Sequence, residues 1–157
     1  MSRRNARHTA FKMLFQMDVG KNTPEMAELT LGEDYAEKRI GTRDLDYVKE
    51  LVSGVREHLA ELDEFISLHS KGWSINRINS MERNILRMSL YEIKYMDGIP
   101  FEVSVNEGVE LAKVYGDDEG YAFVNGILDK ARPENPENPD NTDDIKNPEA
   151  VKDNQDN

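Results

Sequence analysis

The sequence predicts an all-α protein, a compact bundle of about six or seven helices. Apolar residues recur at spacings of three and four along most of the chain, which is the period of one helical face. The alternation typical of a β-strand never lasts for more than four residues. Glycine and proline interrupt the pattern at intervals, and no internal repeat is present.

The first two helices are predicted over residues 4–19 and about 24–39. Gly20 stops the first helix, Pro24 opens the second and Gly41 ends it. The apolar stripe of the first helix is Ala6, Ala10, Met13, Leu14 and Met17. The inward face of the second helix is either Met26, Ala27 and Leu29 or Ala27 and Leu31.

A long third helix is predicted over residues 42–68, with Thr42 as its N-cap. At 1.5 Å per residue it is about 40 Å long. Packing against the other amphipathic helices is preferred here to a free coiled coil. Its apolar stripe alternates steps of three and four through Leu45, Val48, Val52, Val55, Leu59, Leu62 and Ile66.

A short turn over 74–79 follows, with Trp73 and Ile75 as expected core anchors. Ser80 is the expected N-cap of the next helix, which Asp97-Gly98 breaks.

Two helices complete the globular part. Pro100 opens the first of them. The loop over 116–118 precedes the last helix, at about 119–131.

Residues 133–157 differ in kind from the rest of the chain. They hold four of the six prolines, and their only aliphatic residues larger than alanine are Ile145 and Val151. Such a segment buries too little apolar surface to offset its ordering entropy. The sequence therefore predicts a helical domain over 1–132 and a disordered acidic tail over 133–157. The tail is either a solubility extension or a segment that folds back on the basic N-terminus, Arg3 to Lys12, and competes with any anionic partner bound there.

Charge is unevenly distributed along the 157 residues, whose formal net charge is −11. The first seventeen residues carry Arg3, Arg4, Arg7 and Lys12 and no acid, whereas residues 132–157 hold three basic and eight acidic side chains. A strongly negative total argues against a nucleic-acid partner when charge is evenly spread. The basic N-terminus removes that argument.

Catalytic and metal-binding motifs are absent from the sequence. The chain has no Cys, which excludes disulfides and Cys-ligated zinc. Its three histidines lack metal-ligand spacing, and the acids after Gly116 do not match an EF-hand loop. Glu107 and Glu110 fit ordinary solvent-facing positions. No enzyme activity, cofactor or metal is expected. No apolar run approaches the roughly 20 residues of a membrane span, so a cytoplasmic protein is expected.

The basic start of the first helix suggests an anionic partner. Each exposed cation at a helix N-terminus costs roughly 0.3–1 kcal/mol against the macrodipole, so stability does not require this arrangement. Phe11 and Phe15 alternate with Lys12, a combination that single-stranded RNA recognition uses, with stacking of roughly 1–3 kcal/mol per base. A frayed, solvated terminus with both rings in the core is the alternative.

Four sequence blocks resemble the NusB family of transcription antitermination factors. They occur in the family's order and together cover about residues 3–132. The blocks are Ala6-Arg7 with Ala10 and Leu14-Phe15-Gln16, then Leu86 to Ile93, then Val105 to Lys113, and finally Phe123 to Lys130.

The resemblance implies two small helical lobes and a protein that is not an enzyme. It also implies binding to the boxA element of ribosomal RNA transcripts with NusE, in a complex that joins RNA polymerase. Glu82 lies on the helix implied to face NusE, and the loop over 117–120 is expected near the RNA. The RNA-binding residues expected from the charge pattern and the resemblance together are Arg3, Arg4, Arg7, Lys12, Phe15 and Phe123.

Other interpretations remain beside this one. Phe123 precedes Val124 and fits the core as well as an RNA contact. Gly108 stands where the family usually has Ala, and Asn5 interrupts the arginine run. A protein-interaction module that binds a NusE-like partner without RNA selectivity is the alternative function. A stand-alone methyltransferase is excluded by the lack of a cofactor-binding segment.

Overall fold

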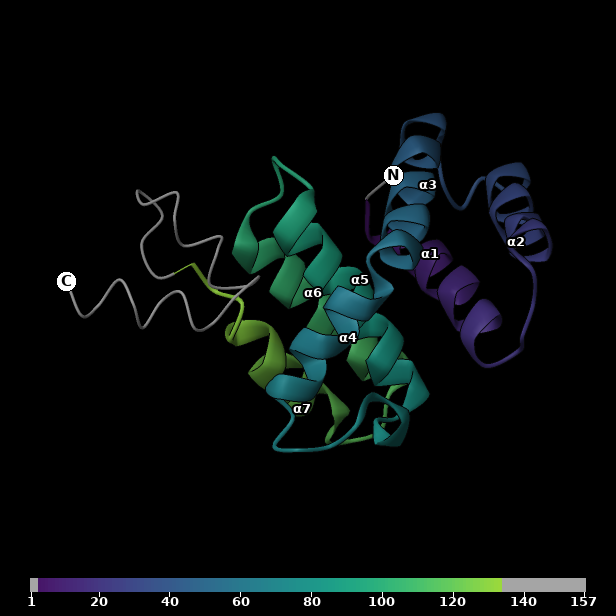
Figure 1. Cartoon of the computed structure of the whole chain (residues 1–157). Coiled ribbons are helices and arrows are strands. Elements are labelled where there is room, and N and C mark those ends of the chain that lie inside the picture. The colour runs from purple at the N-terminus through teal and green to yellow at the C-terminus, as the bar shows by residue number, and fades with distance from the viewer. Residues whose placement is uncertain (1–2, 134–157) are drawn as a thin grey trace.

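A computed structural model describes residues 3–133, which form seven α-helices and one short 3-10 turn without any strand. The all-α prediction is confirmed. Figure 1 shows α1–α3 gathered on one side and α4–α7 on the other, which is the expected two-lobe arrangement. Beyond Pro133, the predicted tail lies outside the described residues. The elements are α1 (Arg3–Asp18), α2 (Pro24–Ala36), α3 (Thr42–Glu57), α4 (Leu59–Leu68), η1 (Ile75–Arg77), α5 (Ser80–Tyr95), α6 (Phe101–Tyr115) and α7 (Gly120–Asp129).

The first lobe packs α2 and α3 against α1. Thr23 caps α2 by accepting a hydrogen bond from the amide of Met26. Ala27 and Leu31 are buried, whereas Met26 and Leu29 are 52% and 71% exposed. Of the two predicted inward faces of α2, the structure therefore has the one formed by Ala27 and Leu31.

The predicted long helix over 42–68 is wrong, because it breaks at His58 into α3 and α4. The His58 ring stacks on Tyr95 of α5, with centroids 4.2 Å apart. One turn earlier, α3 touches α5 so closely that a Cβ at Gly54 would lie 2.1 Å from the Tyr91 ring. We attribute the break to these contacts with α5, because the apolar pattern itself continues without interruption to Ile66.

Three local predictions need correction. Gly41 rather than Thr42 is the N-cap of α3 and makes no side-chain capping bond. Asn79 rather than Ser80 caps α5, where its side-chain oxygen accepts from the amides of Met81 and Glu82. Trp73 is no core anchor, because it is 54% exposed.

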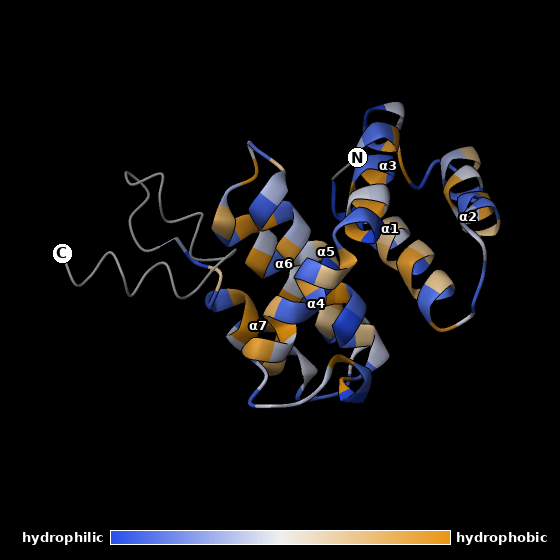
Figure 2. Ribbon diagram, in the orientation of Figure 1, coloured by the Kyte–Doolittle hydropathy of each residue, from blue (hydrophilic) through white to orange (hydrophobic). Residues whose placement is uncertain are grey.

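The second lobe surrounds α5, which contacts α1, α3, α4, α6 and α7. Figure 2 shows apolar stripes on these helices turned toward one another. Gly108 lets α6 approach α5 closely, because a Cβ there would lie 2.6 Å from Ser89 Oγ. In the part of the chain that the structure describes, no helix is long and apolar enough to cross a membrane.

Buried and half-buried polar groups join the end of α1 to the second lobe. Asp18 Oδ2 accepts hydrogen bonds from Arg83 Nη2 at 2.7 Å and from Asn84 Nδ2 at 2.9 Å. Arg87 lies 3.3 Å from the same oxygen and also binds Asp63 of α4. This network fixes α1 against α5, and so sets the position of the basic residues at the other end of α1.

Candidate nucleic-acid interface

Arg7 lies in the protein interior and not on an RNA-accessible surface. Its side chain is 6% exposed and forms a bidentate ion pair with Glu92, with Nε–Oε2 2.8 Å and Nη2–Oε1 3.0 Å. Tyr47 and Ser104 also donate to the Glu92 carboxylate. The sequence-based expectation that stability does not call for these arginines is therefore wrong for Arg7, because it is the counter-ion of a buried acid.

Arg4 lies outside this cluster and remains 56% exposed. Its Nε and Nη2 donate to the two oxygens of Glu107, at 3.0 and 2.8 Å. The hydrogen bond from Arg4 holds the pKa of Glu107 below its usual value, and the charges of Arg4 and Arg7 act in the same direction. Glu107 is thus a partner of the basic residues and not the free solvent-facing acid expected from the sequence.

Arg3 and Lys12 are paired as well. The guanidinium of Arg3 lies 4.3 Å from the centre of the Tyr47 ring and 3.5 Å from Asp44. Lys12 Nζ lies 2.9 Å from Asp34 Oδ2. Every predicted basic contact therefore has a carboxylate partner from another element. We call Arg3, Arg4 and Lys12, the exposed or half-exposed members, the α1 basic edge.

Aromatic rings lie beside this edge. Phe11 is buried and stacks on Tyr115 of α6, with centroids 4.5 Å apart, and on Phe15 at 5.9 Å. His8 Nδ1 lies 3.0 Å from the Tyr115 hydroxyl. Phe11 is thus a core residue, whereas Phe15 is only partly buried and packs on the core from outside.

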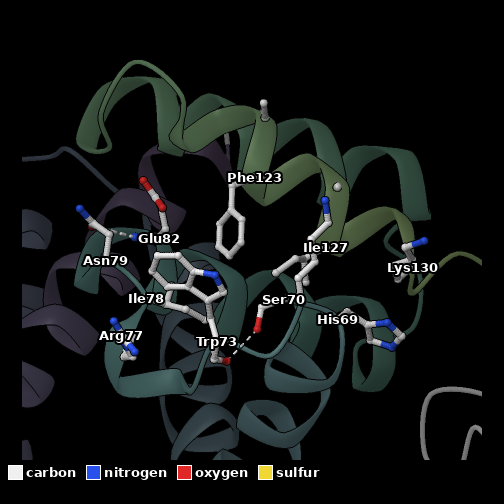
Figure 3. Close-up of a pocket in the computed structure, with 13 residues that line it drawn as sticks. His69, Ser70, Trp73, Arg77, Ile78, Asn79, Glu82, Phe123, Ile127 and Lys130 are labelled. Carbon is white, nitrogen blue, oxygen red and sulfur yellow. Dashed lines mark hydrogen bonds between the residues drawn. The ribbon is translucent and has the colours of Figure 1, made fainter.

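Phe123 and Glu82 lie elsewhere, on opposite sides of a surface groove of about 630 Å³ between α7 and the segment from His69 to Asn79. Figure 3 shows the Trp73 and Phe123 rings facing each other across this groove. Ile78 and Ile127 are buried beneath them. We call this the Trp73 groove.

Glu82 is a buried wall of the groove. The residue is 6% exposed, and its Oε2 has no hydrogen-bond partner among the described residues. The oxygen packs under the start of α7, where a Cβ at Gly120 would lie 2.2 Å from it. Burial raises the pKa of Glu82, and the charge of Asp117 adds to the increase. The loop over 117–120 thus contacts Glu82 as well as leading to Phe123.

The structure brings together Arg3, Arg4, Arg7, Lys12 and Phe15 on α1, and it places Phe123 and Glu82 together at the Trp73 groove. No cluster of three or more His, Cys, Asp or Glu side chains able to hold a metal ion occurs within residues 3–133.

Residues 4–133 match the model of the NusB family. The chain belongs to the NusB family. It is 41% identical over 130 residues to transcription antitermination protein NusB of Desulforamulus reducens, covering 83% of this chain and 89% of that protein. It is 46% identical over 128 residues to the NusB protein of Pelotomaculum thermopropionicum, covering 82% and 87% of the two chains.

Solved NusB structures share this fold. T. maritima NusB superposes with a TM-score of 0.74 at 35% identity, over 82% of this chain and 89% of that chain. A structure of antitermination factors NusB and NusE in complex with dsRNA gives a TM-score of 0.70 at 32% identity, over 81% and 92% of the two chains.

Sequence reasoning missed the acids that pair with α1 and the groove around Trp73. Glu92 carries a signal, since it interrupts the apolar face of α5 with a carboxylate that a buried site must pair. Trp73 carries none, because an aromatic residue next to a turn is as compatible with the core as with the surface.

Proposed function

We propose that this protein is a transcription antitermination factor. It binds boxA-type single-stranded RNA together with NusE and takes part in an antitermination complex with RNA polymerase. Membership of the NusB family and the likeness to a NusB–NusE–RNA structure support this function. We also propose that it acts in the cytoplasm, as a binding factor without catalytic activity.

The α1 basic edge is the observation that carries the RNA-binding part of the proposal. Arg3, Arg4 and Lys12 lie along one helix beside the partly buried ring of Phe15. Each cation is already held by a carboxylate, so an RNA phosphate must replace that carboxylate. This competition lowers affinity for any RNA that does not also stack its bases, and so favours selective binding.

Arg7 has a different part in the proposal. Its guanidinium is bound to Glu92 and covered by protein, which supports a positioning role that holds α1 at the correct angle. Direct contact between Arg7 and RNA stays a prediction, and it would require the buried ion pair to open.

Two further residues with proposed binding roles, Phe123 and Glu82, lie in the second lobe. The Phe123 ring lines the Trp73 groove and is partly buried, which leaves one surface for stacking with a base. The carboxylate of Glu82 is covered by the start of α7, so we propose that NusE is bound by the adjoining surface of α5 and that Glu82 supports the shape of that surface.

Measurement of RNA binding against salt concentration tests this proposal. With about three phosphate contacts, one for each member of the α1 basic edge, log K should fall against log salt with a slope near −2, at about −0.7 per phosphate for a single strand. Binding should be stronger for boxA-like RNA than for a shuffled sequence, and stronger still with NusE present. Binding without salt dependence or sequence preference would contradict it.

Phe123→Ala tests the aromatic contact. Loss of one stacked base should weaken RNA binding by about fivefold to 150-fold, at roughly 1–3 kcal/mol per base. The matched control is Tyr121→Ala, which removes an exposed ring from the same helix outside the groove. Equal effects of the two substitutions would remove Phe123 from the proposed site.

A protein-interaction module that binds a NusE-like partner without RNA selectivity is the alternative function. The complete pairing of the α1 cations favours it, because neutralised cations attract RNA less. A pull-down of NusE with and without boxA RNA separates the two functions. Enhancement by RNA supports antitermination-type assembly, and its absence supports the alternative.

A further inference from the structure

We infer that the Trp73 groove is a docking site for this protein's own acidic C-terminal segment, residues 134–157. The groove offers an apolar floor with a basic rim, and the segment offers acids around two aliphatic residues. The contact shares the Phe123 ring with the proposed RNA site, so the segment and an RNA base would compete for that ring, and the primary test of the contact therefore contains no RNA.

The groove is open and apolar at its centre. Trp73, the only tryptophan of the chain, is 54% exposed, and Phe123 faces it across the groove. Ile78 and Ile127 form the floor. The Trp73 backbone is fixed by Ser70, whose Oγ donates to the Trp73 carbonyl at 2.8 Å, so the ring is held at the surface by a defined turn.

The rim of the groove is positive. Lys71, Arg77 and Lys130 are exposed and line it, together with His69. No carboxylate from residues 3–133 lies within 4.0 Å of any of these three cations. Burial lowers the pKa of His69, and the charge of Lys130 lowers it further. The two groups are therefore close enough to favour an anion between them.

The sequence of the segment is complementary to this surface. Residues 134–157 hold eight acids and two lysines. Three of the acids, Asp140, Asp143 and Asp144, lie within the five residues before Ile145. We place Ile145 between the Trp73 and Phe123 rings, with the aspartates toward the rim lysines.

The connection is short. The described chain ends at Pro133, three residues after Lys130 on the rim. Residues 134–144 form an eleven-residue link with a root-mean-square length of about 18 Å for a flexible chain. A link of this length gives an effective concentration in the millimolar range, so a contact that is weak between separate molecules is still occupied within one chain.

Quenching of Trp73 fluorescence by acrylamide tests the contact directly, because no other tryptophan contributes. We expect a chain that ends at Pro133 to be quenched about twofold more strongly than the full chain at low salt. The difference should disappear at about 1 M salt, where charge contacts are screened beyond roughly 3 Å. Equal quenching of the two chains at low salt overturns the proposal.

Charge substitutions in the full chain identify the site. Lys71→Glu with Lys130→Glu should raise quenching to the level of the shortened chain, because the rim then repels the segment. Lys21→Glu with Lys38→Glu makes the same change in net charge away from the groove and should leave quenching unchanged. If the two double substitutions raise quenching equally, total charge and not the groove controls the exposure of Trp73. That result would overturn the groove as the docking site.

Cysteine cross-linking provides a second readout, since the chain has no cysteine of its own. Ala122→Cys on the groove wall with Ile145→Cys should form an intramolecular disulfide under mild oxidation. Ser53→Cys on α3 with Ile145→Cys is the matched control and should form at least tenfold less. Equal yields, or a cross-link found only between two chains, contradict docking within one molecule.

Discussion

The cations of α1 and the cations around the Trp73 groove lie in opposite electrostatic surroundings. Arg4, Arg7 and Lys12 each have a carboxylate oxygen within 3.0 Å, and Arg3 has one at 3.5 Å. Lys71, Arg77 and Lys130 have none within 4.0 Å among residues 3–133. The most basic stretch of sequence is therefore paired with carboxylates in the fold, whereas two lysines and one arginine from separate parts of the sequence carry unpaired charge at the groove.

Within α1, a second contrast separates buried from exposed pairs. Arg7 and Glu92 are 6% and 2% exposed, whereas Arg4 is 56% exposed beside Glu107. Removing one member of a buried pair leaves an uncompensated charge in the interior, but removing one member of a surface pair leaves a charge that water solvates. The two arginines should therefore affect different properties of the molecule.

Arg7→Ala should give the largest change in stability. The free energy of unfolding should fall by about 3–5 kcal/mol, as expected when a buried ion pair loses one partner. Urea unfolding followed by circular dichroism measures this change. Arg4→Ala is the matched control, and its effect should stay below about 1 kcal/mol. Similar losses for the two variants would remove the distinction between a structural and a surface arginine.

Arg3→Ala with Arg4→Ala should change RNA binding more than stability. Affinity for boxA-like RNA should fall by about tenfold or more, because charge-assisted hydrogen bonds contribute roughly 1.5–3 kcal/mol each. The slope of log K against log salt should become shallower by about 0.7 for each phosphate that the variant no longer binds. Filter binding at several salt concentrations measures both. An unchanged slope would mean that neither arginine binds a phosphate.

Glu82→Gln should stabilise the protein at neutral pH by about 1 kcal/mol, at the low end of the cost of a buried unsatisfied polar group. The folded state raises the pKa of Glu82 above its ordinary value of 4.5. Ionisation therefore penalises folding above that value, and the penalty is absent below it. Unfolding measured at pH 7 and pH 4 checks this, because the gain should be present at pH 7 and small at pH 4.

Glu107 provides the opposite sign of pH dependence, because its pKa is lowered in the fold. Its contribution to stability is present above its ordinary pKa of 4.5 and is lost as pH falls through the lower folded value. A gain at pH 7 from Glu107→Gln, like that expected for Glu82→Gln, would contradict the comparison of the two acids.

Of these substitutions, Glu107→Gln should also change the affinity for RNA least. Without the carboxylate, Arg4 no longer has to leave a partner in order to bind a phosphate, so affinity should rise by a few fold. The loss in stability should stay below about 1 kcal/mol, because Arg4 is mostly exposed. Filter binding with Glu110→Gln as the control separates release of Arg4 from a general loss of negative charge. Equal gains for the two variants would favour the general effect.

The sequence predicted the helices well, because apolar spacing is local information. The bounds of α1 and α6 follow directly from Gly20, Pro100 and Gly116. The break at His58 was not predictable in the same way, because it depends on contacts with Tyr91 and Tyr95 of a distant helix. Where the periodic pattern and the tertiary contact disagree, the contact determines the fold.

The site was only partly predictable for the same reason. The basic residues and Phe15 stand out in the sequence, and the family blocks identified the NusB family correctly. The partners of the arginines are Glu92 and Glu107, which are 85 and 103 residues away from Arg7 and Arg4. Nothing local in the sequence links these pairs, so the burial of Arg7 became visible only in three dimensions.

The distance along the chain between Arg7 and its partners also has a consequence for synthesis. The first helix is made early, but the residues that fix it, Glu92, Ser104 and Glu107, are added about 100 residues later. At about 5–20 residues per second, the ribosome takes about 5–20 s to add them. Until then α1 can pack on α2 and α3, but Arg4 and Arg7 lack the carboxylates that hold them, so a nascent chain cannot complete the α1 basic edge before translation of the globular part is nearly finished.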